Sequence, residues 1–261
     1  MRLLVSVRSE TEALLAAQAG ADFIDLKEPQ AGALGGLPTT TIRSVVQALR
    51  ERGITLPVSA TIGDLPMHQI DRIAACVNAV GACGVDYVKV GIERGRDAGA
   101  VLDMLDACAF SIVPVFIADH GLDFDRVEHA CALGFPAVMA DTADKRVGSL
   151  FDCTSAPLLP RFVQTVRRAG KLVGLAGALR ERHLAALMPL APDFAGFRSA
   201  VCVGDRSSAL DPQRVRGLAD LLHRQTPARV SRVSGPEHAD LAEQHGSHAV
   251  EVVLVDDLDR E

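Results

Sequence analysis

The chain has 261 residues, 48% hydrophobic and 23% charged, so it contains enough apolar surface for a large buried core. Its formal net charge of -6 and pI of about 5.8 argue against nucleic acid or an anionic membrane as the main partner. The length is suited to one α/β barrel or to two smaller domains.

Short apolar runs alternate with longer amphipathic segments along most of the chain. We expect strands at 2–7, 22–27, 56–61, 86–91, 112–118, 136–141, 172–176 and 193–198. We expect helices at 9–20, 39–52, 68–84, 96–109, 123–134, 155–170, 180–190 and 211–224. This alternation predicts an α/β fold with a parallel sheet, and its eight units predict closure into a single (β/α)8 TIM barrel over residues 1–225.

Local signals support several boundaries. Ser9 can cap the first helix, with Glu12 at the capping-box position, and Gly20 follows as a stop signal. Asp211 and Pro212 form a cap followed by a first-turn proline, which predicts the start of the last helix.

Two further segments stand apart from the alternation. Residues 28–38 form a long glycine-rich loop directly after a predicted strand, and loops of that length are often functional. Residues 226–261 form a C-terminal extension whose apolar run, 249–255, is interpreted as an extra strand, a partner contact or one docking strand in a partly ordered tail.

Polar residues recur where a barrel holds its active site, at the carboxyl ends of the strands. Asp25 and Lys27 are two positions apart, so in a strand both side chains point to the same face. If that face is the barrel interior, Lys27 is a candidate Schiff-base nucleophile, and the carboxylate could shuttle protons. The alternative is a structural ion pair at the barrel rim.

Two more predicted strand ends contribute charges. Lys89 lies between Val88 and Val90 in a predicted buried strand, so it either belongs to the site or extends its amine to the barrel mouth. Asp141 and Lys145 follow the sixth strand, where they could serve as acid–base groups and as a phosphate or carbonyl ligand. A solvent-facing loop is the alternative for Lys145.

The loops after strands seven and eight are the usual phosphate site of such barrels. Gly177 would let a phosphate approach backbone amides, and Arg198 or Arg206 could clamp it with two hydrogen bonds. Ser199 and Gly204 lie in the same segment and complete the predicted phosphate-binding set. The alternative is a group of ordinary loop glycines and surface arginines.

Other signals for cofactors and targeting are negative. The six cysteines form no CxxC pair, so we predict reduced thiols and no metal site, and no nucleotide-binding glycine motif points to a cofactor. His120, after strand five, is either a general base or a solvated loop residue.

Without a signal peptide or a membrane-length apolar run, we expect a soluble cytoplasmic protein, and we expect a homo-oligomer.

The motifs resemble one known family. The resemblance rests on seven stretches that run in order from residue 3 to about 206. They are LLVSV, GADFIDLKEPQAGALGG, VSATIGDLP, DYVKVG, VMADTADKRVGSLFD, LVGLAGALRERHL and DFAGFRSAVCVGDR. They are similar to (5-formylfuran-3-yl)methyl phosphate synthase, an enzyme of methanofuran biosynthesis. The resemblance implies a lyase that condenses two glyceraldehyde 3-phosphate molecules into a phosphorylated furan aldehyde with loss of phosphate and water.

The same resemblance assigns the residues. It implies that Lys27 forms the Schiff base and that Asp25, Lys89, Asp141 and Lys145 lie in the site. Two alternatives remain open from the residues alone. One is another Schiff-base aldolase or sugar-phosphate isomerase, and the other is a non-catalytic barrel that binds sugar phosphates and regulates a partner.

Overall fold

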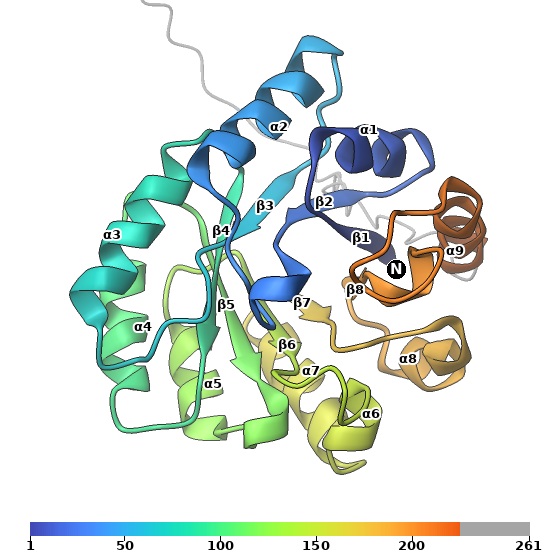
Figure 1. Ribbon diagram of the computed structural model, residues 1–261. Coiled ribbons are helices and arrows are strands. Elements are labelled where there is room, and N and C mark those ends of the chain that lie inside the picture. The colour runs from blue at the N-terminus through green and yellow to red at the C-terminus, as the bar shows by residue number, and fades with distance from the viewer. Residues whose placement is uncertain (225–261) are drawn as a thin grey trace, which may run out of the picture. The chain divides into compact units, whose positions relative to one another are not determined.

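The computed structural model describes residues 1–224, which form a closed barrel of parallel strands in the order β1-β2-β3-β4-β5-β6-β7-β8 (Figure 1). The strands are β1 Arg2–Val7, β2 Phe23–Leu26, β3 Val58–Thr61, β4 Tyr87–Ile92, β5 Ile112–Ile117, β6 Ala137–Asp141, β7 Leu172–Leu175 and β8 Phe194–Phe197. The ring closes where Arg2 of β1 lies opposite Phe194 of β8. The predicted TIM barrel is confirmed.

Helices surround the strands (Figure 1). They are α1 Glu10–Gln18, α2 Thr39–Glu51, α3 Ile70–Gly81, α4 Ala98–Asp106, α5 Phe124–Ala132, α6 Leu150–Cys153, α7 Leu158–Arg168, α8 Leu184–Leu190 and α9 Pro212–Arg224. Short 3-10 turns are η1 Pro29–Ala31, η2 Ala118–His120, η3 Glu181–His183 and η4 Ser199–Val201. The sequence did not predict α6 or the 3-10 turns, because segments of one turn are too short to show a hydrophobic period.

The predicted caps are present at both ends of the helical series. Ser9 Oγ accepts a hydrogen bond from the Glu12 amide at 3.3 Å, and Asp211 Oδ1 accepts one from the Gln213 amide at 2.9 Å. The reciprocal half of the capping box differs from the usual pattern, because the Glu12 carboxylate accepts from the Arg8 amide at 3.0 Å instead of from the Ser9 amide.

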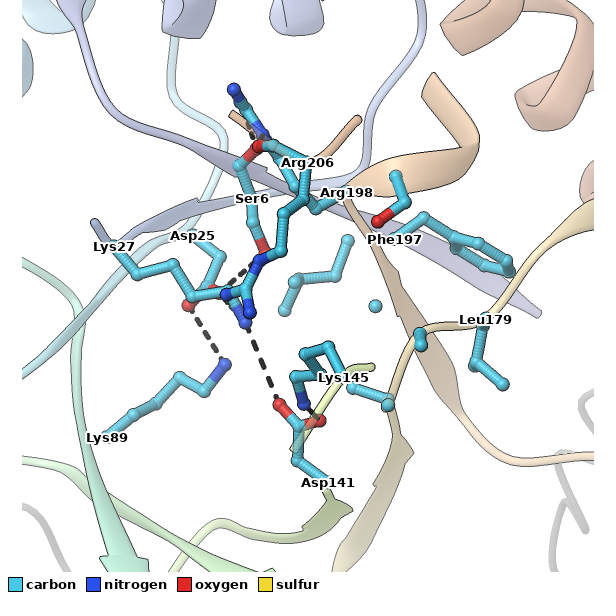
Figure 2. A pocket seen from close by; sticks show the side chains of 16 residues that line it. Ser6, Asp25, Lys27, Lys89, Asp141, Lys145, Leu179, Phe197, Arg198 and Arg206 are labelled. Atoms are coloured by element: carbon cyan, nitrogen blue, oxygen red, sulfur yellow. Dashed lines mark hydrogen bonds and ion pairs between the residues drawn. The ribbon is translucent and has the colours of Figure 1, made fainter. Parts of the chain in front are cut away.

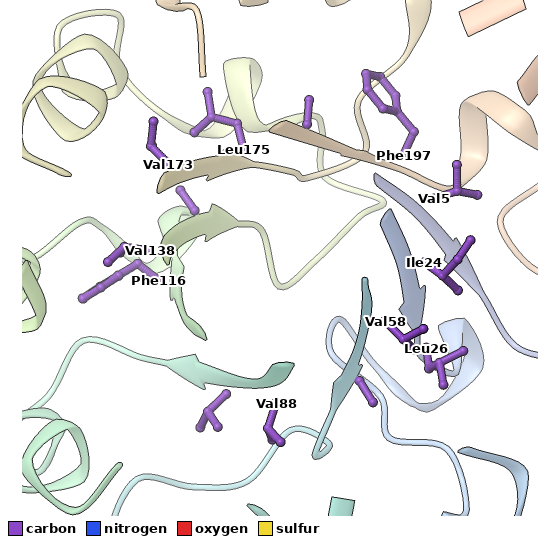
Figure 3. Packing of buried hydrophobic residues seen from close by; sticks show 14 of the residues in the cluster. Val5, Ile24, Leu26, Val58, Val88, Phe116, Val138, Val173, Leu175 and Phe197 are labelled. Atoms are coloured by element: carbon purple, nitrogen blue, oxygen red, sulfur yellow. The ribbon is translucent and has the colours of Figure 1, made fainter. Parts of the chain in front are cut away.

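Strand alternation divides the buried residues into two apolar clusters. Residues such as Val5, Ile24, Val88 and Val138 belong to the cluster between the barrel and its helices (Figure 3). A smaller cluster inside the barrel includes the intervening strand residues, among them Met139. Because the side-chain period of a strand is two, the positions next to the outward-facing ones must point into the barrel.

The predicted extension, 226–261, and its strand-like run lie outside the described residues. None of the helices formed by residues 1–224 is long and apolar enough to cross a membrane.

Candidate active site

A buried carboxylate, that of Asp25, lies at the centre of the site (Figure 2). Strand register places Asp25 opposite Ser6 of β1 and Ser59 of β3. Ser59 Oγ donates to Oδ1 at 2.7 Å, and Ser6 Oγ donates to Oδ2 at 3.1 Å. Lys89 Nζ, from β4, donates to Oδ1 at 2.9 Å. The barrel therefore compensates this buried charge with one ammonium and two hydroxyl groups.

Lys27 lies between two carboxylates. Its Nζ is 3.9 Å from Asp25 Oδ2 and 3.7 Å from Asp141 Oδ2, too far for a close hydrogen bond to either. Asp141 Oδ2 is buried and accepts no hydrogen bond from the described residues. Lys27 is only 7% exposed. The site therefore presents a buried amine that faces two carboxylates without being locked to one of them.

Lys145 is held on the opposite side of Asp141. Its Nζ donates to Asp141 Oδ1 and to the Thr142 carbonyl, and it lies 3.2 Å from Thr142 Oγ1. Burial lowers the pKa of Lys145 to about 8 and outweighs the opposing effect of Asp141, with Lys27 and Arg206 lowering it further. Lys145 is thus partly neutral slightly above physiological pH.

Both carboxylates are ionised at neutral pH. Burial alone would raise the pKa of Asp25, but the charges of Lys89 and Lys27 and the hydrogen bond from Ser59 outweigh it and lower the pKa. Burial opposes ionisation of Asp141 as well, yet Lys145 and Lys27 lower its pKa to about 2. The site therefore contains one network of interacting charges, formed by Asp25, Asp141, Lys27, Lys89 and Lys145.

Two loops at the carboxyl ends of the strands are tied down by carboxylates. Asp119, after β5, accepts from the amides of Ala143 at 2.7 Å and Asp144 at 2.9 Å, immediately before Lys145. Asp64, after β3, accepts from the Leu34 amide at 3.1 Å. The second contact anchors the glycine-rich loop 28–38, and Arg206 Nη2 donates to the Gly32 carbonyl of the same loop at 3.1 Å.

The side chains of this charge network line a pocket. It continues into a larger outer groove, and Lys145, Ala178, Ser199 and Arg206 line both. Apart from the Arg198–Glu12 ion pair, the pocket has four cationic side chains against two carboxylates, Asp25 and Asp141. The cations are Lys27, Lys89, Lys145 and Arg206. This excess of positive charge suits an anionic ligand such as a phosphate ester.

The predicted phosphate-binding residues differ in whether they line the pocket and in whether they are free to bind a ligand. Gly177, Ser199 and Arg206 line the pocket. Arg198 lines it as well, but its guanidinium is paired with Glu12 and with carbonyl groups. Gly204 is exposed in the turn beyond and does not line the pocket. His120 is exposed in η2.

Some features of the site were not anticipated. Ser6 and Ser59 could have been found by asking which inward positions of the neighbouring strands lie opposite Asp25.

Lysine is rare in this chain, with four lysines among 27 basic residues, and three of the four lie in the pocket. Among residues 1–224 no group of three or more His, Cys, Asp or Glu side chains is arranged to hold a metal ion.

Comparison with known proteins places the chain in a family. The family model described as 4-HFC-P synthase matches residues 3–219. The chain belongs to the 4-HFC-P synthase family. A relative from Archaeoglobus fulgidus named (5-formylfuran-3-yl)methyl phosphate synthase is 34% identical over 85% of this chain and 100% of its own length. One of the same name from Methanopyrus kandleri is 35% identical over 85% of this chain and 98% of its own. The resemblance seen in the motifs is confirmed.

Solved structures of similar shape are more distant in sequence. Phosphoribosyl anthranilate isomerase from Thermus thermophilus has a TM-score of 0.60 at 16% identity, covering 87% of this chain and 100% of that chain. For 3-hexulose-6-phosphate synthase from Salmonella typhimurium the TM-score is 0.58 at 16% identity, with the same coverage of 87% and 100%. At such identity these likenesses support the barrel fold alone.

Proposed function

We propose that this protein is a (5-formylfuran-3-yl)methyl phosphate synthase that joins two glyceraldehyde 3-phosphate molecules through an imine on Lys27. The observation that carries the proposal is the position of Lys27 Nζ, 3.9 Å from Asp25 and 3.7 Å from Asp141. The other two lysines of the pocket donate close hydrogen bonds, Lys89 to Asp25 and Lys145 to Asp141. Lys27 is therefore the amine that can turn toward a carbonyl at least cost.

The residues can perform each step of this chemistry. The Lys27 amine adds to one triose aldehyde and releases water as the protonated imine forms, and the positive charge on that nitrogen makes the neighbouring C–H acidic. Asp141 Oδ2 is the nearest carboxylate oxygen without a hydrogen bond, so it is suited to take that proton and give an enamine.

The enamine carbon then attacks the aldehyde of the second triose. Loss of one phosphate and two waters overall balances two trioses against one phosphorylated furan aldehyde, and no oxidant is required. Lys145 is suited to protonate or hold a departing oxygen because it faces both the pocket and the outer groove. Lys89 is suited to hold Asp25 ionised, and to stabilise charge on a second carbonyl.

Trapping with borohydride tests the assignment. Reduction in the presence of glyceraldehyde 3-phosphate should leave a mass adduct on the peptide that contains Lys27. Lys27→Arg should abolish both adduct and turnover, because a guanidinium stays protonated and is a poor nucleophile. Lys171→Arg is the matched control, since Lys171 donates to the Phe135 carbonyl away from the pocket. An adduct on Lys89 or Lys145 would overturn the assignment.

Product analysis separates this function from its alternatives. The synthase should release inorganic phosphate and form a product with furan absorbance and the expected mass. Another aldolase or isomerase would retain both phosphates, and a regulatory barrel would bind the triose without turnover.

A further inference from the structure

The guanidinium of Arg198 has no N–H group left for a ligand. Nε donates to the Arg206 carbonyl at 2.8 Å, and Nη2 donates to the Ser208 carbonyl at 2.8 Å and to Glu12 Oε1 at 3.1 Å. Nη1 donates to Glu12 Oε2 at 2.6 Å and to the Ser6 carbonyl at 3.1 Å. A guanidinium has five N–H donors, and these contacts use all of them.

The Arg198–Glu12 pair is a buried junction between separate parts of the barrel. Each of the two residues is 8% exposed. Glu12 belongs to α1, whereas Arg198 directly follows β8. A buried ion pair adds little net stability, because desolvation offsets its attraction. The orientation that it imposes on the backbone is a better account of why two charges are buried here.

The backbone that Arg198 fixes belongs to a short loop closed by the bridge between Cys202 and Leu210. Arg206 lies within this loop, and its side chain reaches into the pocket, whereas that of Arg198 extends away from it (Figure 2). Among residues 1–224, the hydrogen bond made by the Arg206 guanidinium is one from Nη2 to the Gly32 carbonyl at 3.1 Å. Its remaining N–H groups are thus available to a ligand in the pocket.

We propose that Arg206 is the arginine that binds a substrate phosphate, and that Arg198, held by Glu12, is a positioning residue that sets the loop carrying Arg206. The inference rests on the proposed function, because the anion is the phosphate monoester of the triose. It replaces the simpler expectation that either arginine could clamp the phosphate directly. Loss of Arg198 should then weaken phosphate binding only through Arg206.

Titration of the full-length protein with inorganic phosphate, followed by calorimetry, tests this directly. Arg206→Gln should weaken phosphate binding at least tenfold without lowering the melting temperature. Arg198→Lys should weaken it at least fivefold, because lysine can pair with Glu12 but cannot also bridge the Arg206 and Ser208 carbonyls. The double variant should bind no more weakly than Arg206→Gln alone, since one residue acts through the other.

Arg50→Lys is the matched control. Arg50 also bridges a carboxylate, that of Asp86, and two carbonyl groups, but it lies in α2 and does not line the pocket. Its replacement should leave phosphate affinity unchanged. If Arg198→Lys does not fold, Glu12→Gln serves in its place, because it removes the charge that orients Arg198.

Several results would overturn the inference. Additive losses of phosphate affinity in the double variant would make Arg198 a direct ligand. Unchanged affinity in Arg198→Lys would remove the positioning role of Arg198, and unchanged affinity in Arg206→Gln would remove the binding role of Arg206. Absence of saturable phosphate binding by the unaltered protein would be equally decisive. Because binding is measured without turnover, a protein that binds phosphate through Arg206 but forms no furan would refute the proposed function and leave this inference standing.

Discussion

At the scale of single residues, the three lysines of the pocket differ in their partners and hence in their chemistry. Lys89 is 2% exposed and hydrogen-bonded to a fully buried carboxylate. Lys27 faces two carboxylates at longer range. Lys145 has a pKa lowered to about 8 by burial. A group with that pKa changes charge within the range where enzymes work, so it should control the alkaline side of the rate profile.

We predict that kcat/KM falls as the pH rises above about 8. Lys145 is cationic below its pKa and loses its proton above it, and the cation is the form that donates a proton or holds a phosphate. Lys145→Met should lower kcat/KM by about 10²-fold and remove this alkaline limb, and a pH–rate series measures both. Lys171→Met should leave the profile unchanged. A rate that instead rises through pH 8 to 9 would indicate that the neutral amine of Lys145 is required.

A second prediction concerns the buried pair of Asp25 and Lys89. Asp25→Asn leaves the Lys89 ammonium without its counter-ion, and removal of one partner from a buried pair costs about 3–5 kcal/mol. The double variant Asp25→Asn, Lys89→Met should recover part of that loss, because no unpaired charge remains. Urea unfolding measures the free energies.

The exposed pair of Asp103 and His129 provides the control for that experiment. Asp103→Asn should change stability by no more than about 0.5 kcal/mol, since Asp103 is largely exposed. A double variant at the buried pair that is less stable than Asp25→Asn alone would contradict the electrostatic account.

The sequence could place the charged residues of the site but not their pairing. Strand alternation alone puts Asp25, Lys89 and Asp141 inside the barrel, because their neighbours form the outer core. Which ammonium meets which carboxylate depends on register and tilt across strands that are distant in the chain. The commitment of Arg198 to Glu12 was similarly hidden, because the two residues are 186 positions apart.

At the scale of elements, the turn after β7 is where backbone shape and site geometry meet. Gly177 has a φ of 116°, a conformation that L-residues with side chains rarely adopt. A Cβ there would lie 3.1 Å from Leu150 Cβ and from the side chain of Thr142. Thr142 in turn accepts hydrogen bonds from Lys145, so it connects this turn to the site.

We therefore predict that Gly177→Ala destabilises the protein by roughly 2–3 kcal/mol and lowers turnover, because backbone strain and crowding act together. Gly170→Ala separates these effects. Gly170 has a φ of 74° and no atom within 4 Å of an added Cβ, so its replacement should cost about 1 kcal/mol and leave turnover intact. Thermal unfolding and kcat measure the two variants, and equal kcat values would rule out transmission through Thr142.

Long elements were predictable, whereas the short ones around the site were not. The strands stand out as short apolar runs, and most of the longer helices stand out as amphipathic segments. The one-turn segments α6 and η4 exist because local caps and tertiary contacts hold them. Ser149 and Asp152 form a capping box at α6, and the Arg198 side chain fixes the chain after η4. Of these segments, η4 contributes Ser199 to the pocket, and its geometry comes from the assembled barrel.

At the scale of the whole molecule, closure of the barrel turns scattered sequence positions into a site. Ser6 at one end of the chain and Arg198 near the other are brought together by the pairing of β1 with β8. The last helix secures that seam, since α9 packs against β1 and His223 contacts Asp22 at 2.8 Å. The family model ends at residue 219, within this helix. The residues to which the proposed chemistry is assigned all lie within residues 1–224.

The last prediction follows from this closure. A chain ending after Arg224 should unfold cooperatively and retain kcat/KM within about twofold, because the seam and the pocket are complete. A chain ending after Asp211 lacks α9 and the buried side chains of Val215, Leu218 and Leu222, which cover the β1 side of the barrel. Loss of three such side chains removes several kcal/mol of apolar burial, so the shorter chain should aggregate or remain unfolded. Circular dichroism melting and the furan assay compare the two chains. A chain ending at Arg224 that folds normally but loses tenfold or more in turnover would show that catalysis needs residues beyond the barrel.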